Sequence, residues 1–267
     1  MYAFTYHKPT SARQAATLLS KKEDAKLIAG GHTLLPTMKQ RLAAPTALID
    51  LGACADLKGI ARKGRTIVIG AMTTHAEVAA SPEVQEAIPA LAYLAGHIGD
   101  PHVRHRGTIG GSVANNDPAA DYPSALLALG AMVVTNKRKL SPEEFFTGLY
   151  ETALEEGEIV TRVIFPVVSK AGYAKFRNPA SRYAMVGVFV AKRGPEVRVA
   201  VTGAGANGVF RWAEAEAALK ARFAPKSLDG LKHGAEGING DMHADPDYRA
   251  HLIGVMAKQA VAQAVGK

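Results

Sequence analysis

Two glycine-rich stretches decide how this chain is interpreted: residues 29–36, AGGHTLLP, and residues 108–121, TIGGSVANNDPAAD. In each stretch a Gly-Gly pair precedes polar residues. Glycine has no Cβ, so the backbone can take positive φ angles and approach a ligand closely. Consecutive N–H groups then form an anion-binding concavity, and a helix starting at the N-cap Thr33 would add its positive end. Two such turns can enclose one polyphosphate, so we predict a nucleotide cofactor.

The composition favours a folded protein with an anionic ligand or an acidic partner. The chain has 267 residues, 48% of them hydrophobic, enough to bury the core of one large domain or of several small ones. The formal net charge is +8, but the basic residues are scattered and aromatic residues are only 6%. A nucleic-acid interface would gather basic residues on one face and offer rings for stacking. We therefore expect no nucleic-acid partner.

The cysteine count and the hydropathy of the chain exclude further classes of protein. Cys54 is the only cysteine, which excludes an internal disulfide and any all-cysteine iron–sulfur or zinc site. The N-terminal residues MYAFTYHKPTS carry no apolar leader. No stretch reaches the roughly 18–20 apolar residues of a membrane span. We expect a cytoplasmic protein with no membrane span.

Apolar periodicity and capping residues predict three successive units. The first is a β-α-β-α-β unit over about the first 55 residues, with a helix over 34–41. The second mixes strands with helices, one of which begins at Thr74 with Glu77 at capping-box spacing. In the third unit, three strands form an antiparallel meander and two helices follow. Those strands and helices are predicted at 173–176, 184–192, 196–202, 212–222 and 247–265.

A third glycine motif, Gly203–Gly208, fits G-x-G-x-x-G between an apolar strand and a helix. A dinucleotide-binding turn needs a second strand after that helix, with an acidic residue at its end. Neither is present, since Asp229 lies among polar residues. We interpret the motif as a glycine-rich strand-to-helix loop.

His97, His102 and His105 cluster with Asp100 and form the only candidate metal site. A zinc ion needs three or four convergent ligands, but Pro101 breaks the segment. Two arginines alternate with the histidines and would repel a cation. A polar loop beside an anionic cofactor is the favoured interpretation, and we predict no metal ligands in this chain.

Four segments together resemble one protein family. AGGHTLLP at 29–36, RHRGTIGGSVANNDPAADYP at 104–123, EEGEIVTRVIFP at 155–166 and YAKFRNPASRYAMVGV at 173–188 are similar to the FAD-binding medium subunit of molybdenum hydroxylases, of the carbon monoxide dehydrogenase and xanthine dehydrogenase type. The resemblance implies an α+β fold of the vanillyl-alcohol-oxidase (PCMH) type. It implies FAD-binding subdomains over 1–56 and 57–168. A C-terminal α/β domain over 170–267 would hold a three-stranded antiparallel sheet with helices.

The resemblance also assigns cofactor contacts. Backbone N–H groups of the first glycine segment would wrap the FAD pyrophosphate: Ala29, Gly30, Gly31, His32, Thr33, Leu34 and Leu35. His32 is expected to contact phosphate or solvent rather than to link the flavin covalently. A second set would contact phosphate and the ribityl chain: Thr108, Gly110, Gly111 and Asn115.

Four single residues complete the implied site. Asp121 would accept hydrogen bonds from sugar hydroxyls, and its alternative role is to cap the helix that follows. Lys175 would lie near the flavin, where a cation stabilises a reduced, anionic ring; its alternative is an exposed strand lysine. Val160 would hydrogen-bond the adenine edge through its backbone, and Ile98 would give an apolar contact.

The implied activity is electron transfer within a heteromeric enzyme. Substrate would be oxidised on a large molybdopterin subunit, and electrons would reach this chain through a small subunit with two two-iron two-sulfur clusters. NAD, a quinone or oxygen would be the final acceptor, and a dimer of heterotrimers is the implied assembly. No catalytic side chain is predicted here. The alternatives are a self-contained flavin oxidase or reductase of the same fold and a non-catalytic scaffold.

Overall fold

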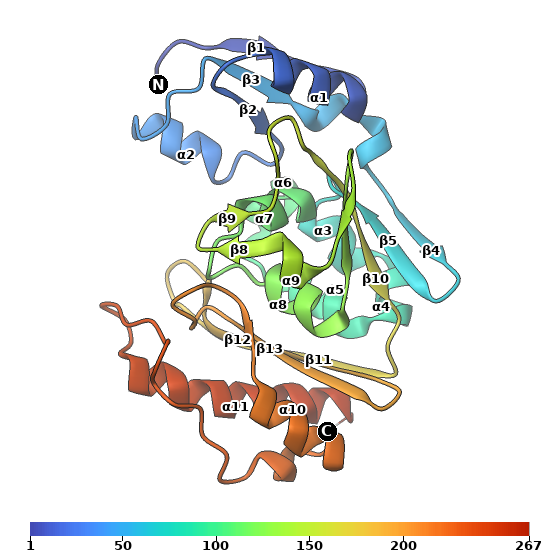
Figure 1. The fold of residues 1–267 in the computed structure, drawn as a ribbon, viewed down its shortest axis with the longest axis vertical. Helices are drawn as coiled ribbons and strands as arrows, with labels where there is room; N and C mark the ends of the chain where they lie inside the picture. The colour runs from blue at the N-terminus through green and yellow to red at the C-terminus, as the bar shows by residue number, and fades with distance from the viewer. Residues whose placement is uncertain (267) are drawn as a thin grey trace.

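The computed structural model describes residues 1–266, which form three units stacked along the long axis of the molecule (Figure 1). We call them the N-terminal unit (1–56), the middle unit (57–168) and the C-terminal unit (170–266). The first contains β1 (Thr5–His7), α1 (Ala12–Lys21), β2 (Ala25–Ile28), α2 (Leu34–Lys39) and β3 (Ala47–Asp50). Its three strands are parallel, in the order β1-β3-β2. This agrees with the predicted alternation of strands and helices.

The middle unit is built on a five-stranded antiparallel sheet in the order β4-β5-β10-β6-β7. Its strands are β4 (Ile60–Lys63), β5 (Thr66–Gly70), β6 (Met132–Thr135), β7 (Lys139–Leu140) and β10 (Val160–Pro166). A two-stranded ribbon joins β8 (Phe146–Gly148) and β9 (Glu151–Thr152). The helices are α3 (His75–Ala80), α4 (Pro82–Ala87), α5 (Pro89–Gly96), α6 (Pro101–Arg106), α7 (Ile109–Asn115), α8 (Tyr122–Leu129) and α9 (Pro142–Phe145).

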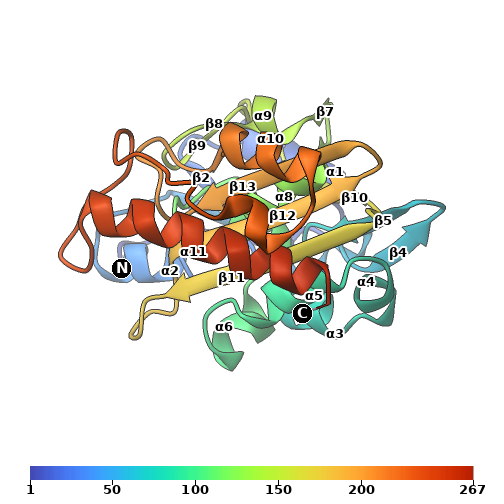
Figure 2. The same cartoon turned by 90° about the horizontal axis from the view of Figure 1, so that it is seen from below.

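The C-terminal unit differs from its prediction by one strand. β11 (Lys170–Arg177), β12 (Ala184–Arg193) and β13 (Glu196–Thr202) form the expected meander, and β14 (Phe210–Arg211) pairs with β13 as a fourth strand. Helices α10 (Ala213–Ala221) and α11 (Pro246–Ala264) lie across one face of this sheet (Figure 2). The short β14 escaped prediction because two residues carry no alternation pattern.

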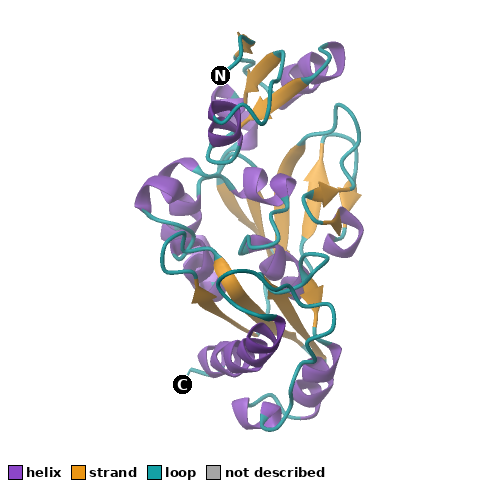
Figure 3. Ribbon diagram, turned by 90° about the vertical axis from the view of Figure 1, so that its left-hand side faces the viewer, coloured by secondary structure: helices purple, strands orange, loops and turns teal. Residues whose placement is uncertain are grey.

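The C-terminal sheet is covered on both faces, as the side view shows (Figure 3). On one face, Trp212 and the buried side of α11 pack with alternate valines of β12 and β13. On the other face, Tyr173 and Phe189 join the same apolar cluster as the buried helix α8 of the middle unit. Residues 184–191 of β12 are therefore buried without interruption, and β11 is held against the middle unit.

Two segments differ locally from their predictions. The second glycine pair does not form a turn: Thr108 accepts a hydrogen bond from the Gly111 N–H and starts α7, so both glycines lie in a helix. The segment after Asp100 is not a polar loop but the helix α6. Pro101 occupies its first turn and Asp100 caps it, a position where proline favours a helix.

Candidate cofactor-binding site

A cavity of about 1210 Å³ lies between the N-terminal and middle units, and residues of the β11–β12 loop also line it. It exceeds the ~300–1,000 Å³ usual for small-molecule pockets, as an extended ligand would require. Thirteen of the fifteen predicted site residues line it: Ala29, Gly30, Gly31, His32, Thr33, Leu34, Ile98, Thr108, Gly110, Gly111, Asn115, Asp121 and Val160. Leu35 and Lys175 are not among its lining residues.

The first glycine segment has the geometry of an anion site. Gly31 has a φ of +75°, which side-chain-bearing residues rarely adopt. The N–H groups of the four residues Gly30 to Thr33 have no hydrogen-bond partner within residues 1–266. Thr33 occupies the N-cap position of α2, but its side chain makes no capping bond, contrary to its expected role. The loop therefore carries consecutive unpaired donors in the wall of the cavity.

The second glycine pair does not offer such donors, which corrects the prediction for this segment. The Ile109 N–H donates to Thr73, the Gly110 N–H to Ala71 at 2.9 Å, and the Gly111 N–H to the Thr108 hydroxyl at 3.1 Å. Neither glycine has a positive φ. At Gly111 the lack of a side chain leaves the wall of α7 open to a ligand, whereas a Cβ on Gly110 would meet Ala71.

The first glycine segment packs directly against the residues that precede the second, and the second packs against the end of β5. A Cβ on Gly30 would lie 2.4 Å from the carbonyl oxygen of Arg106 and 2.7 Å from the Cα of Gly107. A Cβ on Gly110 would lie 2.5 Å from the Cβ of Ala71. Gly30 and Gly110 are therefore required by backbone packing at the floor of the cavity, as well as by any ligand.

The side chain of Asp121 does not cap the helix that follows it. It precedes α8, yet its side chain makes no capping bond, so the capping alternative is wrong. Its Oδ1 instead pairs with the Lys175 Nζ at 2.8 Å and accepts from the Tyr173 hydroxyl. Lys175 is 5% exposed, so the alternative of an exposed strand lysine is also wrong. Lys175 Nζ further donates to the His97 carbonyl at 2.9 Å.

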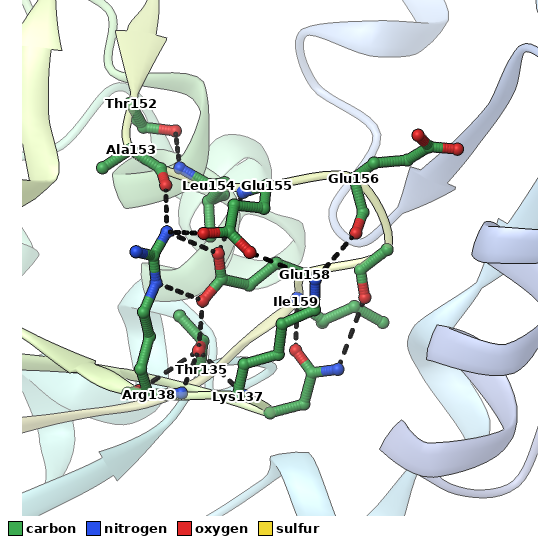
Figure 4. Close-up of polar contacts among 12 residues, drawn as sticks. Thr135, Lys137, Arg138, Thr152, Ala153, Leu154, Glu155, Glu156, Glu158 and Ile159 are labelled. Atoms are coloured by element: carbon green, nitrogen blue, oxygen red, sulfur yellow. Dashed lines mark hydrogen bonds and ion pairs between the residues drawn. The ribbon is translucent and has the colours of Figure 1, made fainter.

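A polar cluster around the buried Glu158 carboxylate fixes the cavity-lining loop that leads to Val160 (Figure 4). The Arg138 Nη2 lies 3.0 Å from the Glu158 Oε2, and the Thr135 hydroxyl donates to Oε1 at 2.6 Å. The Asn136 side chain accepts from the Ile159 N–H at 2.8 Å. Burial alone would raise the pKa of Glu158, but hydrogen bonds from Arg138 and Thr135 lower it to about 2. The loop is therefore held by an ionised carboxylate.

Several cavity residues were not anticipated from the sequence. Tyr150, Arg182 and Tyr183 line the cavity from loops, and Tyr150 and Arg182 have positive φ values of 56° and 63°. His75 is 4% exposed and its Nδ1 is buried without a partner. Burial, helped by the charges of His32 and Arg104, lowers the pKa of His75 to about 4, so it is neutral at pH 7. The capping-box pattern around His75 signalled only a helix start.

The other motifs stay outside this site. The His97 and His105 Nδ1 atoms contact backbone carbonyls at 2.7 Å, and no group of residues within 1–266 has the arrangement of a metal site. The segment 203–208 connects β13 to β14 rather than a strand to a helix. No helix of the described residues is long and apolar enough to cross a membrane.

Comparison with known proteins identifies the family. Residues 2–168 match the model of the FAD binding domain in molybdopterin dehydrogenase. The chain is 35% identical to the carbon monoxide dehydrogenase medium chain of Hydrogenophaga pseudoflava, covering 97% of this chain and 96% of that one. It is 35% identical to the nicotine 6-hydroxylase medium subunit of Paenarthrobacter nicotinovorans, covering 98% and 97%.

The fold agrees with these matches. Reconstituted carbon monoxide dehydrogenase from Oligotropha carboxidovorans superposes with a TM-score of 0.90 at 33% identity, over 99% of this chain and 98% of that chain. The resemblance predicted from four sequence segments is thereby confirmed. The chain belongs to the family of FAD-binding medium subunits of molybdenum hydroxylases, and it is a subunit of an oxidoreductase.

Proposed function

We propose that this chain carries FAD in a heteromeric molybdenum hydroxylase and passes electrons from iron–sulfur clusters to an external acceptor. The observation that carries the proposal is the run of free N–H donors from Gly30 to Thr33, which faces a cavity large enough for a dinucleotide. Bound FAD would supply the redox chemistry. The chain would supply binding, orientation and electrostatics.

The residues divide along the cavity by their chemistry. The donors of Gly30 to Thr33 would hold the pyrophosphate, since backbone N–H groups stabilise anions without a side-chain charge. The open wall at Gly111 would admit the ribityl chain close to α7, and Gly110 would hold that part of α7 against Ala71. Asp121 would accept from a ligand hydroxyl, and the loop ending at Val160 would meet the adenine edge.

The assembly proposed is the one the family implies: a small iron–sulfur subunit and a large molybdopterin subunit, as a dimer of heterotrimers in the cytoplasm. We also propose the PCMH-type subdomain layout, with boundaries 1–56, 57–168 and 170–267. The medium-chain names of the relatives support a multi-subunit enzyme. NAD, a quinone and oxygen are the candidate acceptors.

The test compares two glycines with the same backbone strain. Gly31 (φ +75°) faces the cavity, and Gly230 (φ +77°) lies in the C-terminal unit with nothing within 4 Å of its Cβ position. Alanine at either would cost about 1–2 kcal/mol through the left-handed backbone. At Gly31 the new Cβ would also lie 2.9 Å from the Leu35 Cδ1, the end of a flexible side chain that can turn aside. We expect only Gly31→Ala to lower FAD retention in the purified complex, measured by flavin absorbance per chain.

Each outcome has a defined meaning. A wild-type complex that is colourless and takes up no added FAD would refute the cofactor role. Equal flavin retention in Gly31→Ala and Gly230→Ala would refute the assignment of the phosphate loop. Iron and molybdenum analysis of the purified complex separates the subunit role from a self-contained flavin oxidase, which would contain neither metal.

A further inference from the structure

Three buried side chains form a polar link between the C-terminal unit and the wall of the cavity. Tyr173 and Lys175 are two residues apart on β11, so both project from the same face of the strand. Their hydroxyl and ammonium groups converge on a single oxygen, Oδ1 of Asp121. Asp121 and Lys175 are 4% and 5% exposed, and Tyr173 is fully buried.

The second oxygen of Asp121 is left for another partner. Within residues 1–266, Oδ2 accepts no hydrogen bond, and it is not among the buried polar atoms sealed from solvent. Asp121 lines the cavity whereas Tyr173 and Lys175 do not. Oδ1 is therefore held by the two side chains of β11, and Oδ2 is the oxygen through which the carboxylate contacts the cavity.

The chemistry of the two donors suits this arrangement. Burial raises the pKa of Tyr173 well above its ordinary value, and the neighbouring Asp121 raises it further, so its hydroxyl remains a donor. Burial also raises the pKa of Asp121, while Lys175 and the two hydrogen bonds oppose that rise. A buried carboxylate needs such partners, because an unpaired buried charge is costly.

We propose that Tyr173 and Lys175 are positioning residues that lock Asp121 in one rotamer, with Oδ2 directed to accept a hydroxyl group of the bound cofactor. This inference rests on the proposed function and assigns Lys175 a role through Asp121 rather than through the flavin ring. The second Lys175 contact, to the His97 carbonyl, fixes the ammonium group on the segment that leads to Ile98. The C-terminal unit thus completes the site although it contributes no phosphate-binding loop.

A double-mutant cycle on the purified complex tests the proposal. Tyr173→Phe removes one hydroxyl and conserves the ring, and we expect it to raise the FAD dissociation constant roughly 3–10-fold, the scale of one ordinary hydrogen bond. Asp121→Asn should weaken FAD by at least as much. If Tyr173 acts through Asp121, Tyr173→Phe should change FAD affinity little in the Asp121→Asn background.

Two further variants separate positioning from general stability. Tyr248→Phe makes the same chemical change in the C-terminal unit, at a hydroxyl with no hydrogen bond within residues 1–266, and should leave FAD affinity unaltered. Lys175→Met should weaken FAD, and Lys175→Arg should recover part of the loss because it keeps the charge.

The results that would overturn the inference are distinct from those against FAD binding. Independent, additive effects of Tyr173→Phe and Asp121→Asn on FAD affinity would refute coupling through the carboxylate. So would unchanged FAD affinity in both Tyr173→Phe and Lys175→Met, with thermal unfolding showing that both complexes are folded. Failure of the wild-type complex to bind FAD would instead reject the proposed function itself.

Discussion

Replacing Gly30 by alanine should push apart the N-terminal and middle units where they meet at the cavity. The new Cβ would lie 2.4 Å from the Arg106 carbonyl oxygen and 2.9 Å from the Arg106 carbonyl carbon. Ordinary contacts between carbon atoms are about 3.5–4.0 Å. Both obstructing atoms belong to the backbone, so no side-chain rotation relieves the overlap, and the 106–107 segment must move by about 1 Å.

The expected cost follows from that overlap. Forcing one extra methyl group into a packed site costs about 1–3 kcal/mol, and for a chain of this size each kcal/mol lowers Tm by roughly 2–4 °C. We expect Gly30→Ala to lower the Tm of the complex by about 2–12 °C. It should also release flavin, because Gly30 belongs to the phosphate loop.

The matched control is Gly96→Ala in α5, where the nearest atom to the new Cβ is the Ala79 Cβ at 3.7 Å. Alanine is the better helix former by about 1 kcal/mol, so Tm should stay level or rise. The assay is thermal unfolding of the purified complex followed by tryptophan and flavin fluorescence. Wild-type Tm and full flavin content in Gly30→Ala would show that the N-terminal and middle units do not meet at Gly30 and Arg106 as described.

Three further changes probe the supports of the site. Arg249→Met should destabilise the C-terminal unit in urea unfolding by about 1–3 kcal/mol for each of the two buried backbone carbonyls that it leaves without a donor. The carboxylate of its ion-pair partner Asp241 is 47% exposed and should add little. The exposed-pair variant Lys258→Ala should cost under about 1 kcal/mol. Glu158→Gln should reduce the loss of unfolding free energy below pH 4.5. The wild-type carboxylate stabilises the fold above its unfolded pKa and loses that contribution as pH falls toward about 2. Parallel curves of unfolding free energy against pH for wild type and variant would contradict this. His75→Phe should remove the part of the stability loss that occurs between pH 6.5 and about 4, where the unfolded imidazole binds a proton that the buried one does not. Urea titrations at stepped pH measure the unfolding free energy of the Glu158 and His75 variants. An unchanged slope of that free energy against pH in His75→Phe would count against a neutral buried His75.

Local patterns were sufficient to predict most helices and strands. Thr74 caps α3 as expected, and Ser11 and Ser141 cap α1 and α9 in the same way, because a cap is decided by residues within one turn. The prediction of a turn at the second glycine pair was wrong although it also rested on a local pattern. Two glycines lower helix propensity, yet Thr108 caps the segment and tertiary packing against Ala71 holds it in a helix.

The contacts that finish the site lie beyond the reach of local patterns. Asp121 and its partners on β11 are brought together only by packing of the C-terminal sheet on α8. From sequence alone, a lysine on a strand is expected to point to solvent. Whether it is buried depends on which unit covers that face of the strand. The place of His75 in the cavity wall was not predicted, because the capping box around it accounts for the segment as a helix start without any ligand.

Four glycines at the cavity are glycines for different physical reasons, and this decides how the site can be altered. Gly31 needs its left-handed φ. Gly30 and Gly110 need the absence of a Cβ against backbone or buried atoms. Gly111 is restricted least, since its nearest contacts would be the Thr108 hydroxyl at 3.0 Å and the Ala29 Cβ at 3.7 Å. A small side chain at Gly111 should therefore impair FAD binding more than stability, whereas one at Gly110 should impair both.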